Sequence, residues 1–153
     1  MPSPRQQGFT LIELMVVLII VGIATAAVSI SIKPDPRQLL HKDATRLVQL
    51  LQIAEAEAQA DGRPITWEPG AKGFRFSRPN EQGLGFDDFS ADPQLHPRLW
   101  ESASIKVRVT PRQPVVLNAE WFNPPWRLEL SDGRYRLTVQ RTAAGQLQVV
   151  DAP

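Results

Sequence analysis

The sequence predicts an α+β fold. A long N-terminal helix, apolar in its first half and amphipathic in its second, is expected to pack on an antiparallel β-sheet or β-sandwich of about seven strands. Two observations support this prediction. Up to residue 64, a continuous apolar run is followed by apolar residues at spacings of three and four, whereas from residue 65 apolar and polar residues alternate. The resulting segments are 1–8, a short basic leader; 9–32, an apolar helix; 33–64, an amphipathic helix; and 65–153, a β-rich head.

The apolar run is the strongest pattern in the chain. From Leu14 to Ile32 there are 19 uncharged residues, which at about 1.5 Å each span roughly the hydrocarbon core of a bilayer. Arg5 precedes the run and Lys33 follows it, so charge only weakly favours a cytoplasmic N-terminus. An ordinary secretory signal would need a shorter apolar region without Glu13. The run therefore predicts a membrane-spanning helix.

Glu13 is the one charge within this apolar segment. A carboxylate in the spanning region costs about 2.5–3.5 kcal/mol on insertion scales. We therefore expect it to have a positively charged partner. A polar residue tolerated near the membrane interface is the alternative.

The residues from Gln7 to Leu14, QGFTLIEL, resemble the processing motif of type IV pilins and type II secretion pseudopilins. The resemblance implies that a prepilin peptidase cuts after Gly8 and N-methylates the new terminus, Phe9. It also implies that Glu13, the fifth residue after the cut, serves methylation and assembly by meeting the Phe9 amine of a neighbouring subunit. Gly8, Phe9 and Glu13 are therefore the expected processing residues.

Two prolines, Pro34 and Pro36, predict a kink or break after the apolar helix. A second helix is expected from about Arg37 to Asp61, with Gly62 as its left-handed cap. Its apolar stripe consists of Leu40, Ala44, Leu47, Leu51, Ala54 and Ala58, widened by Leu50 and Ile53. A coiled-coil seam is the alternative, but the stripe lasts barely three heptads and leads straight into strands. The pattern favours packing on the chain's own sheet.

Seven alternating runs predict the strands of the head. They centre on Ile65 and Trp67, Phe74 and Phe76, Val107 and Val109, Val115 to Leu117, Leu128 and Leu130, Leu137 and Val139, and Leu147 and Val149. Pro69-Gly70 is expected to turn the first hairpin. Asp132-Gly133 predicts a two-residue hairpin turn, which would place Glu129 opposite Arg136.

Residues 79–103 contain several glycines and prolines but are too apolar for a solvated linker. A loop of this length is either functional or contains short elements. It includes Trp100, and a second aromatic group follows at Trp121, Phe122 and Trp126. One interpretation is core and loop packing. The other is a docking surface for another subunit, because aromatic residues are enriched at interfaces.

Several classes of site find no support in the sequence. There is no cysteine, neither His41 nor His96 stands in a metal-ligand spacing, and no nucleophile or phosphate-loop motif occurs. We therefore expect no enzyme, no cofactor and no metal. Asp87, Asp88 and Asp92 raise the alternative of calcium, but their spacing matches no calcium loop and a solvated acidic loop is preferred.

Gly133-Arg134-Tyr135-Arg136 is similar to a Gly-Arg-x-Arg motif of DNA-uptake minor pilins. Arg134 and Arg136 are therefore candidates for phosphate contacts, with a polar outer strand face as the alternative. Removal of Arg5 with the leader leaves 16 of the 17 Lys and Arg residues against 16 Asp and Glu. That balance gives no general attraction to nucleic acid, and we do not expect a nucleic-acid partner.

The whole layout is most similar to the H-type minor pseudopilins of type II secretion. The shared features are chain length, the Pro-bearing break, the Asp-Gly-Arg-Pro helix end and the β-rich head. The resemblance implies a single-pass inner-membrane subunit with a periplasmic head, at or near the tip of a pseudopilus that helps to export folded proteins. The implied partners are other minor and major pseudopilins, the prepilin peptidase and the inner-membrane assembly platform. A minor type IV pilin that binds DNA or a surface is the alternative.

Overall fold

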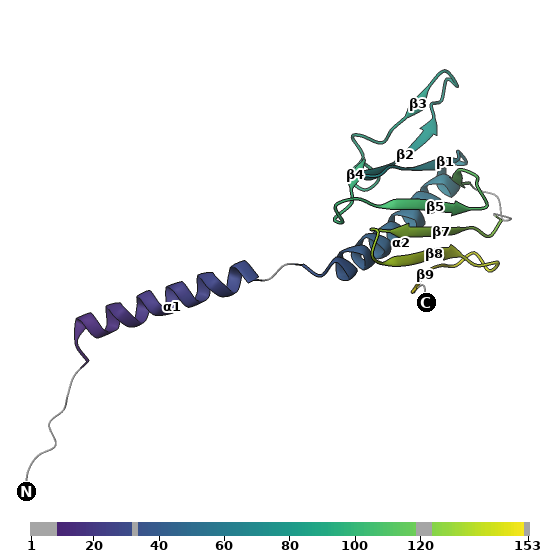
Figure 1. Cartoon of the computed structure of the whole chain (residues 1–153). Helices are drawn as coiled ribbons and strands as arrows, with labels where there is room; N and C mark the ends of the chain where they lie inside the picture. The colour runs from purple at the N-terminus through teal and green to yellow at the C-terminus, as the bar shows by residue number, and fades with distance from the viewer. Residues whose placement is uncertain (1–8, 32–33, 119–123, 152–153) are drawn as a thin grey trace, which may run out of the picture. The chain divides into compact units, whose positions relative to one another are not determined.

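The computed structural model describes residues 9–31, 34–118 and 124–151. The chain divides into two units, Met1–Pro34 and Asp35–Pro153, and we call the second the head unit. The helices are α1 (Leu11–Ser31) and α2 (Pro36–Asp61). The strands are β1 (Ile65–Pro69), β2 (Gly73–Pro79), β3 (Phe86–Asp87), β4 (Arg98–Leu99), β5 (Lys106–Thr110), β6 (Val115–Leu117), β7 (Arg127–Ser131), β8 (Arg136–Arg141) and β9 (Leu147–Asp151) (Figure 1). The predicted α+β fold is confirmed.

The first helix, α1, is apolar on all sides. Every side chain that the structure describes from residue 9 to residue 27 is exposed, including large residues such as Leu18 and Ile23. In the described part of the chain, no helix has the length and apolar character needed to cross a membrane. An apolar surface of this kind is suited to burial by surroundings outside its own unit.

The second helix, α2, has clear start and stop signals. The carboxylate of Asp35 accepts a hydrogen bond of 2.9 Å from the Arg37 amide, and Pro36 occupies the first turn. Gly62 ends the helix with φ at +67°, the left-handed conformation that glycine adopts without steric cost. The helix thus begins one residue earlier than the sequence predicts.

The strands of the head unit form two antiparallel sheets. The first has the order β3-β2-β1-β6, with β4 also paired to β2, and the second has the order β5-β7-β8-β9. The seven predicted strands are all present, and β3 and β4, of two residues each, lie in the segment 79–103. That segment therefore contains short elements.

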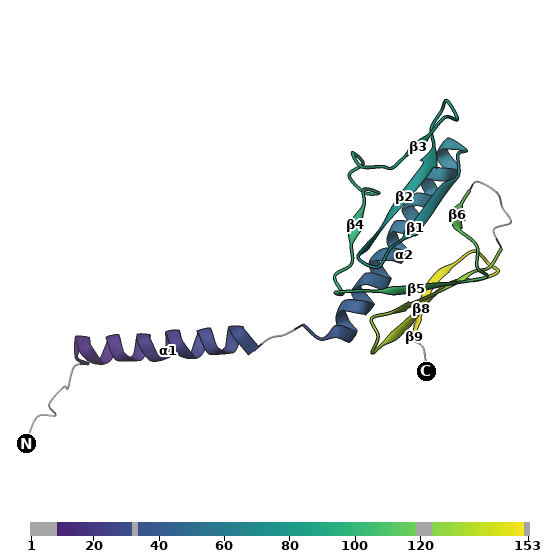
Figure 2. The ribbon, with the colours of Figure 1, turned by 45° about the horizontal axis from the view of Figure 1, so that its top comes forward.

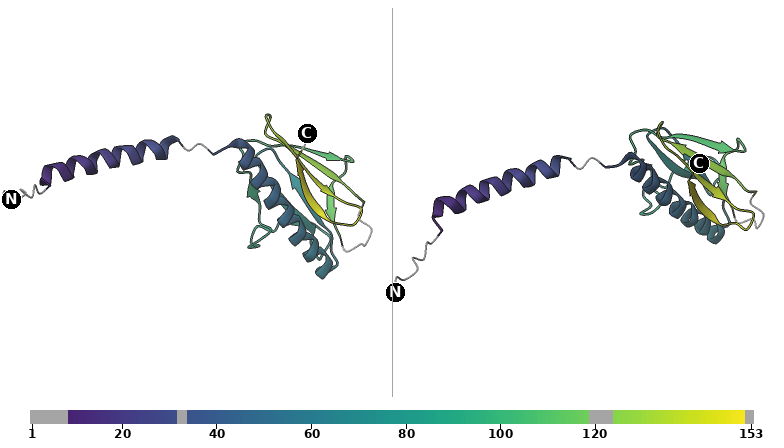
Figure 3. Two further views of the ribbon diagram at one scale, coloured as in Figure 1. Left: turned by 90° about the horizontal axis from the view of Figure 1, so that it is seen from below. Right: turned by 60° about the horizontal axis from the view of Figure 1, so that its bottom comes forward.

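One helix covers both sheets. α2 contacts β1 and β6 of the first sheet and β7, β8 and β9 of the second. In Figure 2, β1 and β2 run alongside α2 whereas β5 crosses it, and Figure 3 shows α2 on one side of the strands. The opposite face of the second sheet is left without a covering element from the described residues.

The core lies between α2 and the inner faces of the two sheets. Its largest fully buried side chains are Trp67, Phe76, Leu40, Leu47, Leu51, Ile65, Leu95, Ile105, Leu117, Leu128, Leu130 and Val139. The Phe74 ring packs against the Trp100 ring at a centroid distance of 4.6 Å and contacts the Phe76 ring edge-on at a centroid distance of 6.0 Å. The predicted stripe of α2 is buried, and the helix is held by packing on its own sheets.

The β7–β8 hairpin differs from the prediction. The expected two-residue turn at Asp132-Gly133 is wrong, because Ser131 pairs with Arg136 and the loop has four residues. The Asp132 Oδ1 atom accepts hydrogen bonds from the amides of Arg134, at 2.8 Å, and Tyr135, at 2.7 Å. These two bonds hold the longer loop, which explains why the local Asp-Gly signal did not set its length.

The longer loop changes the pairing between β7 and β8 by two residues. Glu129 lies opposite Thr138 rather than Arg136, so the predicted cross-strand pair is also wrong. Glu129 instead faces Arg108 on β5, at 4.0 Å between Oε1 and Nη1. A shift of two residues keeps each side chain on its expected face, so the inner row of β8 is unchanged.

Candidate processing segment and interaction surfaces

The residues expected at the processing site lie at the start of α1. Gly8 is outside the described residues. Phe9 is 82 % exposed, and α1 begins two residues later, where the amides of Glu13 and Leu14 donate to the Thr10 carbonyl at 3.1 and 3.3 Å. Glu13 therefore stands in the first turn of the helix, where the helix dipole favours a carboxylate.

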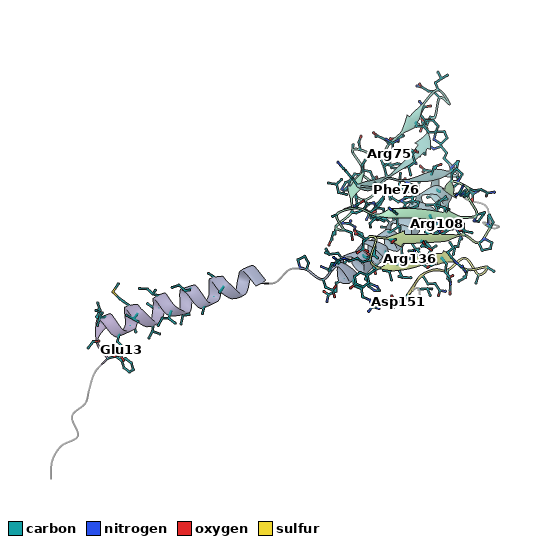
Figure 4. The ribbon with its side chains drawn as sticks, viewed as in Figure 1. Glu13, Arg75, Phe76, Arg108, Arg136 and Asp151 are labelled. Atoms are coloured by element: carbon teal, nitrogen blue, oxygen red, sulfur yellow. The ribbon has the colours of Figure 1, made fainter. Side chains whose placement is uncertain are left out.

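The Glu13 side chain is exposed at this helix end (Figure 4). Its carboxylate forms no ion pair with any residue that the structure describes. The apolar side chains around it, Leu11, Ile12 and Leu14, are also exposed. If this surface becomes buried, the carboxylate needs a cation from outside the described residues, because an unpaired buried charge is costly.

Asp43 is a structural residue that the sequence analysis did not single out. It lies on the buried side of α2 with 0 % exposure. One carboxylate oxygen accepts from the Glu101 amide and the other from the Ser102 amide, each at 2.9 Å. Arg46 reaches the same carboxylate at 3.1 Å and donates to the Leu99 carbonyl at 2.8 Å. This clamp fixes the end of the segment 79–103 on α2.

A signal for Asp43 was present in the sequence. The residue stands three positions after Leu40 and four before Leu47, so it falls on the apolar stripe of the helix. A carboxylate on a buried stripe requires hydrogen-bond donors. The sequence could indicate this need, but it could not indicate that the donors lie 58 and 59 residues further along the chain.

Two arginines tie the C-terminal half of α2 to the two sheets. On β8, Arg141 is 7 % exposed and forms an ion pair with Glu55. On β2, Arg78 lies 2.6 Å from Asp61 and stacks over the Phe89 ring at 4.9 Å. The hydrogen bond from Arg78 lowers the pKa of the Asp61 carboxyl. Both contacts fix α2 on the sheets of the head unit, which is a structural role.

The aromatic residues proposed for an interface occupy different environments. Trp100 is 6 % exposed, and its indole N–H donates to the Gly70 carbonyl at 2.9 Å. The interface hypothesis is therefore corrected for Trp100, which packs in the core against Phe74. Trp126 is partly buried against the core. Trp121 and Phe122 lie outside the described residues.

The β4 strand that precedes Trp100 depends on a glycine. Gly73 pairs with Leu99, and a Cβ atom at Gly73 would lie 2.2 Å from the Arg98 carbonyl oxygen. Since real Cβ atoms do not approach backbone this closely, only glycine permits the pairing.

The acidic residues of the segment 79–103 hold turns. Asp92 Oδ1 accepts from the amides of Gln94, at 2.8 Å, and Leu95, at 2.7 Å. The hydrogen bond from the Leu95 amide lowers the pKa of the Asp92 carboxyl. Asp88 accepts in the same way from the Ser90 amide at 3.0 Å. Among the described residues, no group of three or more His, Cys, Asp or Glu side chains could hold a metal ion.

The two arginines considered for phosphate contacts are both exposed. Arg134 lies in the β7–β8 loop, and Arg136 is the first residue of β8. Arg136 points away from α2, because its neighbour Leu137 is buried and successive side chains of a strand alternate. Arg136 therefore lies at one corner of the uncovered face of the second sheet, and Arg134 lies in the adjoining loop.

Comparisons with known proteins give a consistent result. The model of the family described as "Prokaryotic N-terminal methylation motif" matches residues 3–29, and that of "Type II transport protein GspH" matches residues 43–150. The solved structure of the minor pseudopilin EpsH from the type 2 secretion system of Vibrio cholerae is similar, with a TM-score of 0.55 at 14 % identity. The match covers 71 % of this chain and 93 % of that one, and at this identity it shows the fold. No curated protein matches the chain significantly.

Proposed function

Because the chain belongs to the family described as "Type II transport protein GspH", we propose that it is a minor pseudopilin of type II secretion and stands at or near the tip of a periplasmic pseudopilus. There it joins other pseudopilins and helps to drive the export of folded proteins. Its contribution is structural, and no catalytic step is assigned to it.

The observation that supports this proposal is the contrast between the two units. The head unit buries a continuous core under α2, whereas the described side chains of α1 from residue 11 to residue 27 are all exposed. An all-round apolar helix on a self-sufficient head needs an apolar environment from elsewhere. Packing against the helices of neighbouring subunits provides one.

The methylation motif supports a processing step before assembly. We infer that a prepilin peptidase cuts after Gly8 and N-methylates Phe9 while residues 9–32 reside in the inner membrane and the head unit faces the periplasm. The inner-membrane assembly platform then moves the processed chain into the pseudopilus.

Glu13 links processing to assembly in this proposal. Its carboxylate is exposed in the first turn of α1 and has no ion-pair partner among the residues described. The Phe9 amine of a neighbouring subunit supplies the missing positive charge. Pairing in apolar surroundings is strongly coupled, since removing one member leaves the other charge unpaired.

Mass spectrometry of the protein from its own cells tests the processing step. The expected mature chain begins with N-methyl-Phe9. Gly8→Val places a branched side chain at the cut, and the variant should remain full length in the membrane. Gly22→Val is the matched control, because a Cβ at Gly22 meets nothing within 4 Å. A mature terminus near Ala26 would indicate an ordinary signal peptide instead.

Deletion of the gene tests the assignment to secretion. Export of folded proteins should stop, while twitching and DNA uptake continue. The reverse pattern would favour a minor type IV pilin.

A further inference from the structure

The outer face of the second sheet is positively charged. Four exposed cations point away from α2: Lys106 and Arg108 on β5, Arg127 on β7 and Arg136 on β8. They surround one carboxylate, Glu129. We call this set of five residues the basic face, and Figure 4 labels Arg108 and Arg136 on it.

The strand register places these side chains close together. Across β5, β7 and β8 the outer face has three cross-strand rows: Lys106, Ser131 and Arg136; Arg108, Glu129 and Thr138; and Thr110, Arg127 and Gln140. On β9, Val150 and Gln148 extend the second and third rows. Neighbouring strands lie about 4.8 Å apart and each residue advances about 3.3 Å along a strand, so the four cations lie within two strand spacings across the sheet and within about 13 Å along the strands. Their inward neighbours Leu128, Leu130, Leu137 and Val139 are buried in the core, which holds the outer rows in place.

The charge of this face is not neutralised within the described residues. The one ion pair there joins Arg108 to Glu129 at 4.0 Å, with the Arg108 side chain 74 % exposed. Such an exposed pair contributes little. Lys106, Arg127 and Arg136 have no ion-pair partner in the part of the chain that the structure describes. The whole chain has a net charge of +1, whereas this one face carries four cations and one carboxylate.

We propose that the basic face is the surface through which this head unit docks onto an acidic surface of a neighbouring pseudopilin head. The proposal rests on the proposed function and adds the surface and the chemistry of the contact. Complementary charge would orient the two heads and fix their register, which is what electrostatic contacts do best at interfaces.

The same observations argue against nucleic acid as the occupant. The outer rows contain no aromatic side chain, whereas single-stranded nucleic acid is held on platforms of stacking aromatics. Glu129, at the centre of the face, would repel phosphate groups. An acidic protein surface can avoid Glu129 by placing its own polar groups there.

A small charged contact is sufficient in a pseudopilus. The helices of assembled subunits already hold the heads together, so a head-to-head contact forms at high effective concentration. Under these conditions the contact needs to select an orientation rather than provide the affinity of a free complex.

Photo-crosslinking of the full chain in cell envelopes tests the proposal. The chain has no cysteine, so Thr138→Cys provides a unique attachment point beside Glu129 for a cysteine-reactive benzophenone. Thr45→Cys, on an exposed position of α2, is the control position. The expected product joins position 138 to an Asp- and Glu-rich head peptide of another pseudopilin, identified by mass spectrometry.

A charge-reversal variant then tests whether charge causes the contact between the basic face and the neighbouring head. Arg108→Glu combined with Arg136→Glu should lower the yield of this product at least about fivefold, as for loss of electrostatic complementarity. Lys42→Glu combined with Lys72→Glu makes the same charge change at exposed positions outside the basic face and should leave the yield unchanged. Equal melting temperatures of the variants would show that the fold is retained.

The other outcomes separate the possible failures. The proposal would be overturned if charge reversal left the crosslinking yield unchanged. It would also be overturned if the adduct were nuclease-sensitive instead of a protein adduct. Pseudopilin adducts from position 45 but not from position 138 would retain the proposed function and place docking elsewhere. Absence of pseudopilin adducts at both positions would contradict the docking surface and the proposed assembly together.

Discussion

The two helices differ in where their side chains are buried. α1, of 21 residues, exposes all its described side chains, whereas α2, of 26 residues, buries eight residues on one face. The apolar residues of α1 surround the helix, and those of α2 form a stripe at spacings of three and four. The all-round apolar surface of α1 is suited to burial by surroundings outside its own unit, whereas the apolar stripe of α2 is buried against the chain's own sheets. The proposed assembly segment and the folding segment are therefore separate, consecutive parts of the sequence.

The largest effect is expected from removing α2. A fragment of residues 35–153 should melt cooperatively, and a fragment of residues 65–153 should not fold. The shorter fragment loses four buried leucines, at roughly 2–5 kcal/mol each, which exceeds the usual stability of a domain. Circular dichroism melting distinguishes the two. Equal, cooperative melting of both fragments would show that α2 is not part of the core.

The same substitution in each helix sharpens the comparison. Leu51 is fully buried and Leu18 is 63 % exposed. Leu51→Ala should lower the free energy of unfolding of the head unit within the full chain by about 2–5 kcal/mol, as measured by urea denaturation of the full chain in detergent. Leu18→Ala should leave this value unchanged. A similar loss from both substitutions would contradict the division into an assembly helix and a folding helix.

Removing the buried carboxylate of α2 should cost more stability than removing the exposed carboxylate that caps the helix. Asp43→Ala leaves the amides of Glu101 and Ser102 without their acceptor and should cost about 2–4 kcal/mol. Asp35→Ala removes the N-cap hydrogen bond and should cost about 1 kcal/mol. Denaturation midpoints of the two variants give the comparison, and protease cleavage should increase within residues 79–103 only for Asp43→Ala. Equal midpoints would show that the clamp adds nothing beyond a helix cap.

The smallest pair of effects concerns two glycines. Gly73→Ala forces β4 away from β2, because the new Cβ would meet the Arg98 carbonyl oxygen, and we expect a loss of about 1–3 kcal/mol. Gly22→Ala enters open space on α1 and should raise helix propensity slightly. Hydrogen exchange at the Trp100 amide, which donates to the Lys72 carbonyl at 3.0 Å, reports the first change. Unchanged protection of this amide in Gly73→Ala would refute the close approach.

The sequence could predict those parts of the fold that depend on local patterns. The buried stripe from Leu40 to Ala58 and the seven longer strands follow from periodicity. The Asp43 clamp joins residues 58 and 59 positions apart, and β4 depends on the close approach to Gly73. A local sequence pattern shows neither the long sequence separation within the Asp43 clamp nor the close approach of backbone at Gly73. The four-residue β7–β8 loop was missed because Asp132 uses its side chain to hold a longer turn than Asp-Gly alone requires.

The candidate sites show the same limit. The motif around Phe9 and Glu13 is contiguous, so the sequence alone predicts it. For Trp100 the composition leaves both core packing and an interface open, because it does not show which aromatic side chain the core covers. The basic face combines residues from three strands, and only the register of β5, β7 and β8 brings Lys106, Arg108 and Arg136 together.

The most direct test of the central claim is Glu13→Ala in cells that make only this variant. Glu13 should matter for assembly and not for folding or insertion, because removing a carboxylate from an apolar helix makes insertion no less favourable. We expect normal membrane levels, cleavage after Gly8 and an unchanged melting temperature of the head unit. Crosslinking to other pseudopilins and protein secretion should both be lost, and Glu13→Gln, which keeps the shape without the charge, should behave the same way. Normal crosslinking together with normal secretion would contradict the account.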